Sequence, residues 1–256
     1  MKGLQSKRIL VAGSATGIGA ATAKRLGEEG VRLVLGDINL EGVNSVAEEI
    51  NANGGKAIAI KFDLADPDSI TALIDFTVEQ LGGLDGIANV AADLSNETIG
   101  QDLDLLQMQL PIWDKTLKSN LVGFALIIKQ SLPHLIAAGG GSIVNTTSAA
   151  SWVGEKIRPA YAASKAGVNT LTRHVAATWG KDNVRCNAVS PGAVLSETAL
   201  RQMSPEFQQA MKDAISLTRL GKPDDLGNTI AFLLSDDAQW VTGQVWSVNG
   251  GGGFRD

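Results

Sequence analysis

Short β-rich runs alternate with longer helical patterns along nearly the whole of this 256-residue chain. Strands that alternate with helices at this spacing form right-handed βαβ units, whose strands are parallel and whose helices cover both faces of the sheet. We therefore predict a doubly wound α/β fold of about seven parallel strands in a single domain, residues 1–256. The predicted strands are 8–12, 31–35, 56–62, 84–88, 141–147, 183–189 and 243–248, and the predicted helices are 20–29, 41–51, 69–81, 112–138, 160–179 and 224–234.

A glycine-rich turn joins the first predicted strand to its helix, and its residues are Gly13, Ser14, Ala15, Thr16, Gly17, Ile18 and Gly19. Glycines at such a turn let the backbone bend sharply and approach a pyrophosphate, which the N-terminus of the helix then stabilises. This turn is more specific than an ordinary glycine turn, because a strand precedes it, a helix follows it and an acidic residue ends the next strand. The chain is thus expected to bind a dinucleotide in a Rossmann-type fold.

Asp37 is the acidic residue that follows the second predicted strand. Its carboxylate can accept both hydroxyls of an adenosine ribose, and it would repel a 2′-phosphate. No arginine or lysine in 14–16 or 38–40 offsets that repulsion. The residues therefore favour NAD over NADP as the cofactor, whereas the alternative role for Asp37 is the N-cap of the following helix.

The charge and the cysteine content narrow the ligand class and the compartment. The formal charge is −5, with 22 basic and 27 acidic residues mixed along the chain. That mixture leaves no basic stripe for nucleic acid and no polybasic anchor for a membrane. The single cysteine, Cys186, cannot form a disulfide within the chain. We therefore expect a soluble, cytoplasmic protein whose partner is a small, near-neutral molecule.

Tyr161, the only tyrosine, stands four positions before Lys165 and thirteen positions after Ser148. On a helix, side chains at positions i and i+4 share a face, about 5–6 Å apart at Cβ. A free phenol titrates near ~10, and lowering its pKa to ~7 requires roughly 4 kcal/mol. An ammonium about 4 Å away supplies roughly that energy at an effective dielectric of ~20. This spacing predicts a general base, although a packing tyrosine, a solvated lysine and a strand-end serine are the alternatives.

Further residues continue the same ordered pattern: Asn89, Asn120, Ser148, Tyr161, Lys165, Pro191 and Gly192. With the glycine turn, they resemble the short-chain dehydrogenase/reductase family over residues 7–251. The resemblance implies that a phenolate at Tyr161 takes a proton from a secondary alcohol while hydride passes to the nicotinamide, with Ser148 as hydrogen-bond donor. It implies a proton relay at Asn120, where a helix-bending asparagine is the alternative, and contact of Lys165 with the nicotinamide ribose. The other cofactor residues that it implies are Asp63 and Leu64 at the adenine, Asn89 and Ala91 in the cleft, and Pro191, Gly192, Val194 and Ser196 at the carboxamide.

Two stretches interrupt the alternation, 93–110 and 193–220, and both follow strands at the edge where open α/β sheets bind ligands. We expect both to be substrate loops. Large apolar side chains around one polar centre favour a bulky hydrophobic secondary alcohol or ketone of steroid, terpenoid or aryl type, although half of them could equally be core. The expected substrate-binding residues are Leu94, Ser148, Trp152, Tyr161, Leu195 and Met203, with Met108, Leu110, Val153, Leu200 and Phe207 beside them.

Two other functions fit the same residues. A 3-oxoacyl-carrier-protein reductase is compatible with the resemblance, but such enzymes usually use NADPH, against which Asp37 argues. A dinucleotide-binding regulatory protein without turnover would not need the full catalytic set. The resemblance also implies a homo-oligomer, a tetramer or a dimer. No metal site is expected, because His134 and His174 lack a cysteine or acidic partner at ligand spacing.

Overall fold

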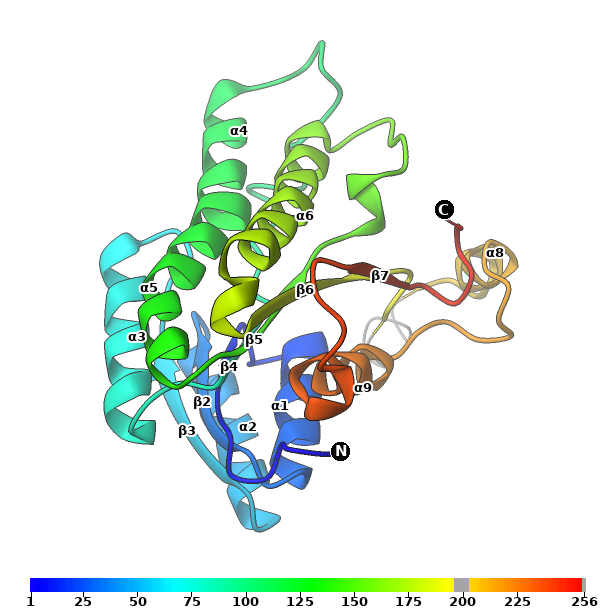
Figure 1. Ribbon diagram of the computed structural model, residues 1–256. Helices are drawn as coiled ribbons and strands as arrows, with labels where there is room; N and C mark the ends of the chain where they lie inside the picture. Colours follow the sequence, from blue (N-terminus) through cyan, green and yellow to red (C-terminus); the bar gives the residue numbers. More distant parts are fainter. Residues whose placement is uncertain (196–202, 255–256) are drawn as a thin grey trace.

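The computed structural model describes residues 1–195 and 203–254, and its centre is a seven-stranded sheet in the order β3-β2-β1-β4-β5-β6-β7 (Figure 1). Every neighbouring pair of strands is parallel. The predicted doubly wound α/β fold is therefore confirmed. The strands are β1 (Arg8–Ala12), β2 (Arg32–Asp37), β3 (Lys56–Lys61), β4 (Gly86–Asn89), β5 (Gly141–Thr146), β6 (Val184–Pro191) and β7 (Val245–Val248).

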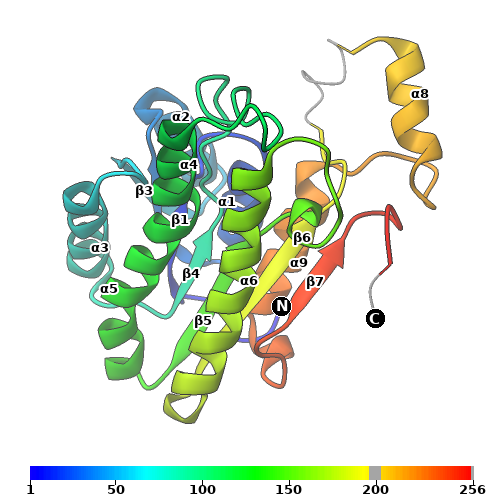
Figure 2. The ribbon, with the colours of Figure 1, turned by 90° about the horizontal axis from the view of Figure 1, so that it is seen from above.

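Helices cover both faces of the sheet (Figure 2). One face carries α1 (Gly17–Glu28), α2 (Leu40–Ala52) and α9 (Pro223–Leu234), whose apolar side chains pack into one buried cluster. The other face carries α3 (Pro67–Leu81), α4 (Leu110–Leu117), α5 (Phe124–Ala137) and α6 (Pro159–Trp179). Shorter helical segments are η1 (Lys118–Gly123), η2 (Ala149–Ser151), η3 (Gly180–Asp182) and η4 (Asp236–Ala238), and α8 (Pro205–Asp213) follows β6.

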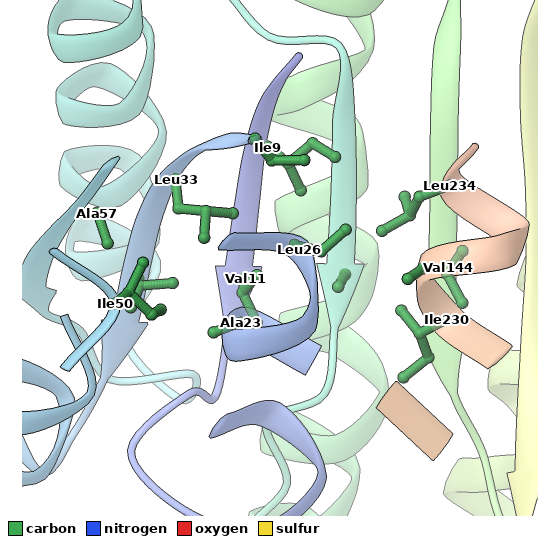
Figure 3. Close-up of a cluster of buried hydrophobic side chains, with 14 of the residues drawn as sticks. Ile9, Val11, Ala23, Leu26, Leu33, Ile50, Ala57, Val144, Ile230 and Leu234 are labelled. Atoms are coloured by element: carbon green, nitrogen blue, oxygen red, sulfur yellow. The ribbon is translucent and has the colours of Figure 1, made fainter. Parts of the chain in front are cut away.

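Strand β1 shows why the strands read as continuous apolar runs. Successive side chains of a strand point to opposite faces, and a sheet covered on both sides buries all of them. Ile9 and Val11 pack in the cluster with α1, α2 and α9, which Figure 3 shows, whereas Leu10 and Ala12 pack in the cluster on the other face. The sheet is thus the hydrophobic centre from which the loops at its carboxyl edge project.

The predicted helix 112–138 is a continuous helix from Leu110 to Ala137 that contains the π-helical segment η1. Its apolar composition, with a hydropathy of 1.2, meets the length and composition of a membrane span. However, 44% of that apolar window is buried inside the molecule, and Phe124, Ile127 and Leu135 pack in the core cluster on this face of the sheet. We therefore assign this helix to the protein core.

Helix α8 lies within the stretch 193–220, where no helix is expected from the sequence. Ser204 caps it, because its hydroxyl accepts a hydrogen bond from the backbone nitrogen of Phe207 at 3.2 Å, and Pro205 takes the first helical position. None of its described residues is buried. The signals available in the sequence were its capping residues and the helical spacing i, i+3, i+4 of Phe207, Ala210 and Met211.

The strand order determines where on the sheet a ligand can bind. The chain moves outward from β1 through β2 to β3, and then crosses to β4 on the other side of β1. Connections that leave in opposite directions open a crevice at the carboxyl ends of the strands. At this point the carbonyl oxygen of Ala12 accepts hydrogen bonds from the backbone nitrogens of Val90 and Ala91, both at 2.8 Å. The glycine turn and the segment after β4 are therefore held side by side.

Candidate functional site

A cleft of about 680 Å³ lies at the carboxyl ends of β1, β2, β3 and β4. The turn after β1, the end of β2 and the segments after β3 and β4 all contribute to its lining. Most of the residues predicted for the dinucleotide meet in this cleft: Gly13, Thr16, Gly17, Ile18, Gly19, Asp37, Asp63, Leu64 and Ala91.

The glycine turn has the shape needed for a phosphate group above the N-terminus of α1. At Gly13, φ is +90°, and at Gly19 a Cβ atom would stand 1.7 Å from the carbonyl oxygen of Gly13, so only glycine fits. At Gly17, φ is +56°, and no described atom lies within 4 Å of the Cβ position. The first turn of α1, all of it described, has neither a side-chain cap nor an acidic residue. Its N–H groups can therefore receive an anion, and these residues fit the pyrophosphate of a nicotinamide dinucleotide.

Asp37 lines the same cleft, and its carboxylate is oriented by backbone N–H groups. One oxygen accepts from the nitrogen of Ala15 at 2.9 Å, and the other accepts from the nitrogen of Asn39 at 3.0 Å. The N-cap of α2 is Asn39, whose side chain accepts from the nitrogen of Gly42. The alternative role of Asp37 as that N-cap is therefore wrong, and its remaining lone pairs are available to a ligand in the cleft.

Two predicted cofactor residues are buried behind the cleft. The hydroxyl of Ser14 donates to the carbonyl oxygen of Gly36 at 3.3 Å. The amide nitrogen of Asn89 donates to Asn145 at 2.9 Å, and the amide nitrogen of Asn145 donates in turn to Thr172. Asn89 therefore connects β4 to β5, and it is not among the residues that line the cleft, where the resemblance placed it.

The cleft also contains residues that sequence reasoning missed, and Leu94, which was expected at the substrate, lies here. Most of the missed residues directly follow a strand next to a predicted residue, so the signal was their position. Lys115 and Ser119 come from the long helix. The only signal for them in the sequence was their spacing of four positions, which places both side chains on one face of that helix. The missed residues are Ile38, Phe62, Ala65, Val90, Ala92, Asp93, Ser95, Lys115 and Ser119.

Ser148, Tyr161 and Lys165 come together beside this cleft, as the spacing predicted. Ser148 lies two residues beyond the end of β5, and its oxygen accepts a hydrogen bond from the nitrogen of Ala150 at 3.2 Å. Its hydrogen can therefore be donated to the phenol oxygen of Tyr161, with which Ser148 forms a hydrogen bond. Tyr161 lies in the first turn of α6 with 9% of its surface exposed, and Lys165 follows on the next turn with 1% exposed.

Burial controls the ionisation of Tyr161. It raises the pKa of the phenol, while a hydrogen bond with Ser148 and the charge of Arg158 lower it, and the charge of Glu155 raises it. The net direction is upward. The spacing of Tyr161 and Lys165 predicted a lowered phenol pKa, and this prediction is wrong. Desolvation destabilises the buried phenolate by more than the neighbouring groups stabilise it.

Lys165 is itself affected by burial, which lowers its pKa to about 7. Its Nζ donates to the carbonyl oxygen of Thr146 at 3.0 Å and lies 4.7 Å from the ring centroid of Phe124. The same nitrogen stands 5.9 Å from the ring centroid of Tyr161. Burial therefore disfavours the charged form of this lysine, the form on which the predicted effect on the phenol depends.

Asn120 lies in the π-helical segment η1 and is fully buried. Its amide oxygen accepts from the nitrogen of Asp93 at 2.8 Å, and its amide nitrogen donates to the carbonyl oxygen of Asp93 at 3.2 Å. π-Helical segments occur frequently at functional sites. The side chain of Asn120 therefore connects the long helix to the start of the stretch 93–110, and its role in a proton relay stays a prediction.

The turn after β6 lies at the same edge of the sheet. The nitrogen of Gly192 donates to the carbonyl oxygen of Val248, and a Cβ atom on Gly192 would stand 2.6 Å from the Cα atom of Asn249. Val194 pairs with Gly221, which also accepts from the nitrogen of Leu195 at 3.1 Å. Pro191 ends β6. Ser196 and Leu200, both expected in this region, lie outside the described residues.

The apolar residues expected at the substrate do not form one closed pocket. Trp152 donates from its indole nitrogen to the hydroxyl of Ser190 at 3.4 Å, and a Cβ atom on Gly253 would stand 2.7 Å from its ring. Leu195 and Met203 are partly buried. The others lie exposed at the edge of the site: Leu94, Met108, Leu110, Val153 and Phe207, joined by Leu105 and Leu106.

The described residues contain no group of three histidine, cysteine or acidic side chains placed to hold a metal ion. His174 instead packs edge-on against Trp179, with ring centroids 5.8 Å apart.

Known proteins of similar sequence and structure indicate the class of reaction that this site performs. A family model described as enoyl-(acyl carrier protein) reductase matches residues 12–252. Cyclohexanol dehydrogenase of Acinetobacter sp. (strain SE19) is 36% identical over 246 residues, which are 96% of this chain and 94% of that protein. The 3-oxoacyl-[acyl-carrier-protein] reductase of Thermotoga maritima is 34% identical over 253 residues, 97% of this chain and 98% of that protein. The solved structure of a 7α-hydroxysteroid dehydrogenase complexed with NADH and 7-oxo glycochenodeoxycholic acid has a TM-score of 0.89 at 31% identity, covering 99% of this chain and 96% of that one.

Gly19→Ala should abolish dinucleotide binding, because the added Cβ would stand 1.7 Å from the carbonyl oxygen of Gly13 and force the turn open. We expect the dissociation constant for NADH, measured by fluorescence titration, to rise more than about tenfold, or 1.4 kcal/mol. Gly180→Ala is the matched control, since no described atom lies within 4 Å of its Cβ position. Equal NADH affinity in the two variants would contradict this assignment of the turn.

Proposed function

This chain belongs to the short-chain dehydrogenase/reductase family and is an oxidoreductase acting on CH–OH groups with a nicotinamide dinucleotide, and on that premise we propose that it is an NAD-dependent dehydrogenase of bulky hydrophobic secondary alcohols. The observation that carries the proposal is the buried phenol of Tyr161, hydrogen-bonded to Ser148 one helical turn from Lys165 and beside the glycine-lined cleft.

In this mechanism Tyr161 moves the proton at the carbinol oxygen of the substrate. For ketone reduction, the phenol donates its proton to the developing alkoxide, and for alcohol oxidation the phenolate takes the proton back. The hydroxyl of Ser148 donates to the same oxygen, since its own oxygen is already held by the nitrogen of Ala150. The bound dinucleotide supplies the hydride acceptor or donor. Lys165 would hold its nicotinamide ribose, and Pro191, Gly192, Val194 and Ser196 its carboxamide.

Asn120 would take part in the proton relay, and its two hydrogen bonds to the backbone of Asp93 hold its side chain at the start of the stretch 93–110. We assign the adenine to Asp63 and Leu64, which line the cleft beyond β3. The choice of NAD over NADP rests on Asp37, whose carboxylate would accept ribose hydroxyls and repel a 2′-phosphate.

A hydrophobic substrate is favoured by the apolar residues around the site. Leu105, Leu106 and Met108 are 67%, 99% and 45% exposed, so the stretch 93–110 presents an apolar surface to the solvent. We propose that this stretch and 193–220 are the substrate loops for an alicyclic, steroid, terpenoid or aryl alcohol. Two of the similar proteins are named for cyclohexanol and for a hydroxysteroid, both of which carry a secondary alcohol on an apolar ring.

A 3-oxoacyl-carrier-protein reductase is the second candidate, and the similarity to the Thermotoga maritima reductase favours it. Its usual NADPH would have to be accommodated beside Asp37, which argues for the first candidate. A regulatory protein that binds a dinucleotide without turnover is a third possibility, and the assembled Ser148, Tyr161 and Lys165 argue against it. The free, buried thiol of Cys186 is compatible with the cytoplasm as the compartment of this enzyme.

We also propose that the chain forms a homo-oligomer, a dimer or a tetramer, through α5 and α6. A surface groove of about 490 Å³ runs between these helices. A self-complementary pair of helices is a suitable surface for a two-fold interface with a second copy. Its apolar lining includes Ile128, Leu132, Ile136, Leu171, Val175 and Trp179.

Tyr161→Phe removes the proton carrier, and we expect turnover to fall by about 10²–10⁴-fold while NADH binding persists. A panel of secondary alcohols with NAD, followed as NADH forms, identifies the substrate class. Because burial raises the pKa of Tyr161, alcohol oxidation should rise as pH increases toward that raised pKa, while ketone reduction should fall over the same range. Unaltered turnover in the variant would contradict the mechanism, and a wild-type protein that binds NADH but turns over nothing would favour the regulatory alternative.

Asp37→Ala should weaken the preference for NAD, because the repulsion of a 2′-phosphate disappears. We expect the ratio of kcat/KM for NADP to that for NAD to rise about tenfold, equivalent to 1.4 kcal/mol. Glu41→Gln is the control, since it removes a negative charge from the first turn of the nearby α2 without touching the cleft. If the wild-type enzyme already prefers NADP, the cofactor assignment is wrong.

Ile136→Glu should dissociate the oligomer, because it places a charge on a groove residue that is 38% exposed in the single chain. We expect light scattering to show the mass of a monomer for this variant and of a dimer or tetramer for the wild type. Ile58→Glu, at a comparable exposure of 40% on β3, should leave the mass unchanged. A monomeric wild type would refute the proposed interface.

A further inference from the structure

Asp102, in the stretch 93–110, is buried against the helix that carries Tyr161. Only 3% of its surface is exposed. One carboxylate oxygen accepts from the backbone nitrogen of Tyr161 at 2.8 Å, and the other accepts from the nitrogen of Ala160 at 3.2 Å. The carbonyl oxygen of Asp102 also accepts from the nitrogen of Arg158 at 2.8 Å. Three hydrogen bonds therefore join this loop residue to the start of α6.

Helix α6 needs such a partner because its own sequence supplies no cap. The residue at the N-cap position is Arg158, which has φ +67° and makes no side-chain hydrogen bond to the described helix. Pro159 has no N–H group, so Ala160 and Tyr161 are the first residues of α6 whose N–H groups need partners. Asp102 satisfies both, and its negative charge lies at the positive end of the helix dipole.

The same stretch is attached to a second helix. Asp93, at its start, is held by both amide atoms of Asn120 in η1. The stretch is therefore fixed to the long helix at one point and to the first turn of α6 at another. Leu103, Leu105 and Leu106, which follow Asp102 directly, are the exposed apolar residues next to the site.

We propose that Asp102 is a positioning residue for Tyr161: it connects the loop that receives the substrate to the turn that holds the phenol. This inference rests on the proposed dehydrogenase function. A phenol at the end of a side chain is sensitive to the orientation of its helical turn, and a misplacement of about 1 Å can cost about 10²-fold in rate. Asp102 keeps that turn in place without touching the substrate oxygen.

The test compares Asp102→Ala, Asp102→Asn and a control in the same stretch, Asp104→Ala. The side chain of Asp104 accepts from the nitrogens of Leu106 and Gln107, so its loss disturbs the loop but not its bonds to α6. We expect kcat of Asp102→Ala to fall about 10²-fold. Asp102→Asn, which keeps one acceptor oxygen, should recover much of this loss, and Asp104→Ala, which keeps the three bonds to α6, should lose less kcat than Asp102→Ala. NADH affinity should be unchanged in all three.

A second measurement does not depend on turnover. Because Tyr161 is the only tyrosine, tyrosinate absorbance on raising pH reports on this residue alone. The charged groups around it are Arg158 and Glu155 from the preceding loop, Lys165 from α6 and Asp102 itself, and only the last is lost in the variants. Asp102→Asn removes the same charge as Asp102→Ala, so the difference between their transitions reports the loosening of the turn. We expect the transition in Asp102→Ala to move down toward the ordinary phenol value of ~10, because a loosened turn exposes the ring.

The outcomes separate this inference from the proposed function. A wild-type protein without turnover on any alcohol would overturn the function, while a shifted tyrosinate transition would still support the positioning role. Wild-type kcat in Asp102→Ala, an equal loss in Asp104→Ala, or an unshifted transition would each overturn the positioning role. If Asp102→Ala fails to fold, judged by circular dichroism and NADH binding, Asp102→Asn decides by the same two readouts.

Discussion

A parallel sheet buried on both faces brings the carboxyl ends of its strands to one edge, and every functional feature of this protein depends on that constraint. Burial of both faces requires helices on both sides, and helices that leave β1 and β4 in different directions open the crevice between them. The glycine turn follows β1, Asp37 ends β2 and Ser148 lies beyond β5, yet all lie at this edge. None of them would meet the others in a sheet with mixed strand directions.

The chemistry of the site also depends on the low polarity around the reacting groups. A pair of side chains at i and i+4 in partly solvated surroundings would favour a phenolate beside an ammonium. In this protein, burial raises the pKa of Tyr161 and lowers that of Lys165 to about 7, so both charged forms are disfavoured. The site therefore holds the phenol ready to give a proton, and a positive charge brought by an oxidised dinucleotide would act in the direction of the phenolate.

Much of the fold could be predicted because core strands and helices carry their burial pattern in the sequence. Strand β1 reads as an unbroken apolar run since both of its faces are covered, and the paired faces of α1 and α9 repeat at helical spacing. Helix α8 was not recognised, because its apolar spacing at Phe207, Ala210 and Met211 covers only one turn and none of its described residues joins the core. The π-helical segment η1 was also missed, because one extra residue in a turn leaves the apolar pattern of a helix nearly unchanged.

The sequence by itself determined the alternation of parallel strands and helices, the glycines that a dinucleotide turn requires, and the spacing of Ser148, Tyr161 and Lys165. These are local properties, since each depends on residues close together in the chain. Only the tertiary structure decided the ionisation of Tyr161 and Lys165 and the attachment of Asp102 to α6. Both depend on groups that are distant in sequence: desolvation sums over every neighbour that excludes water, and Asp102 reaches Tyr161 across 59 positions.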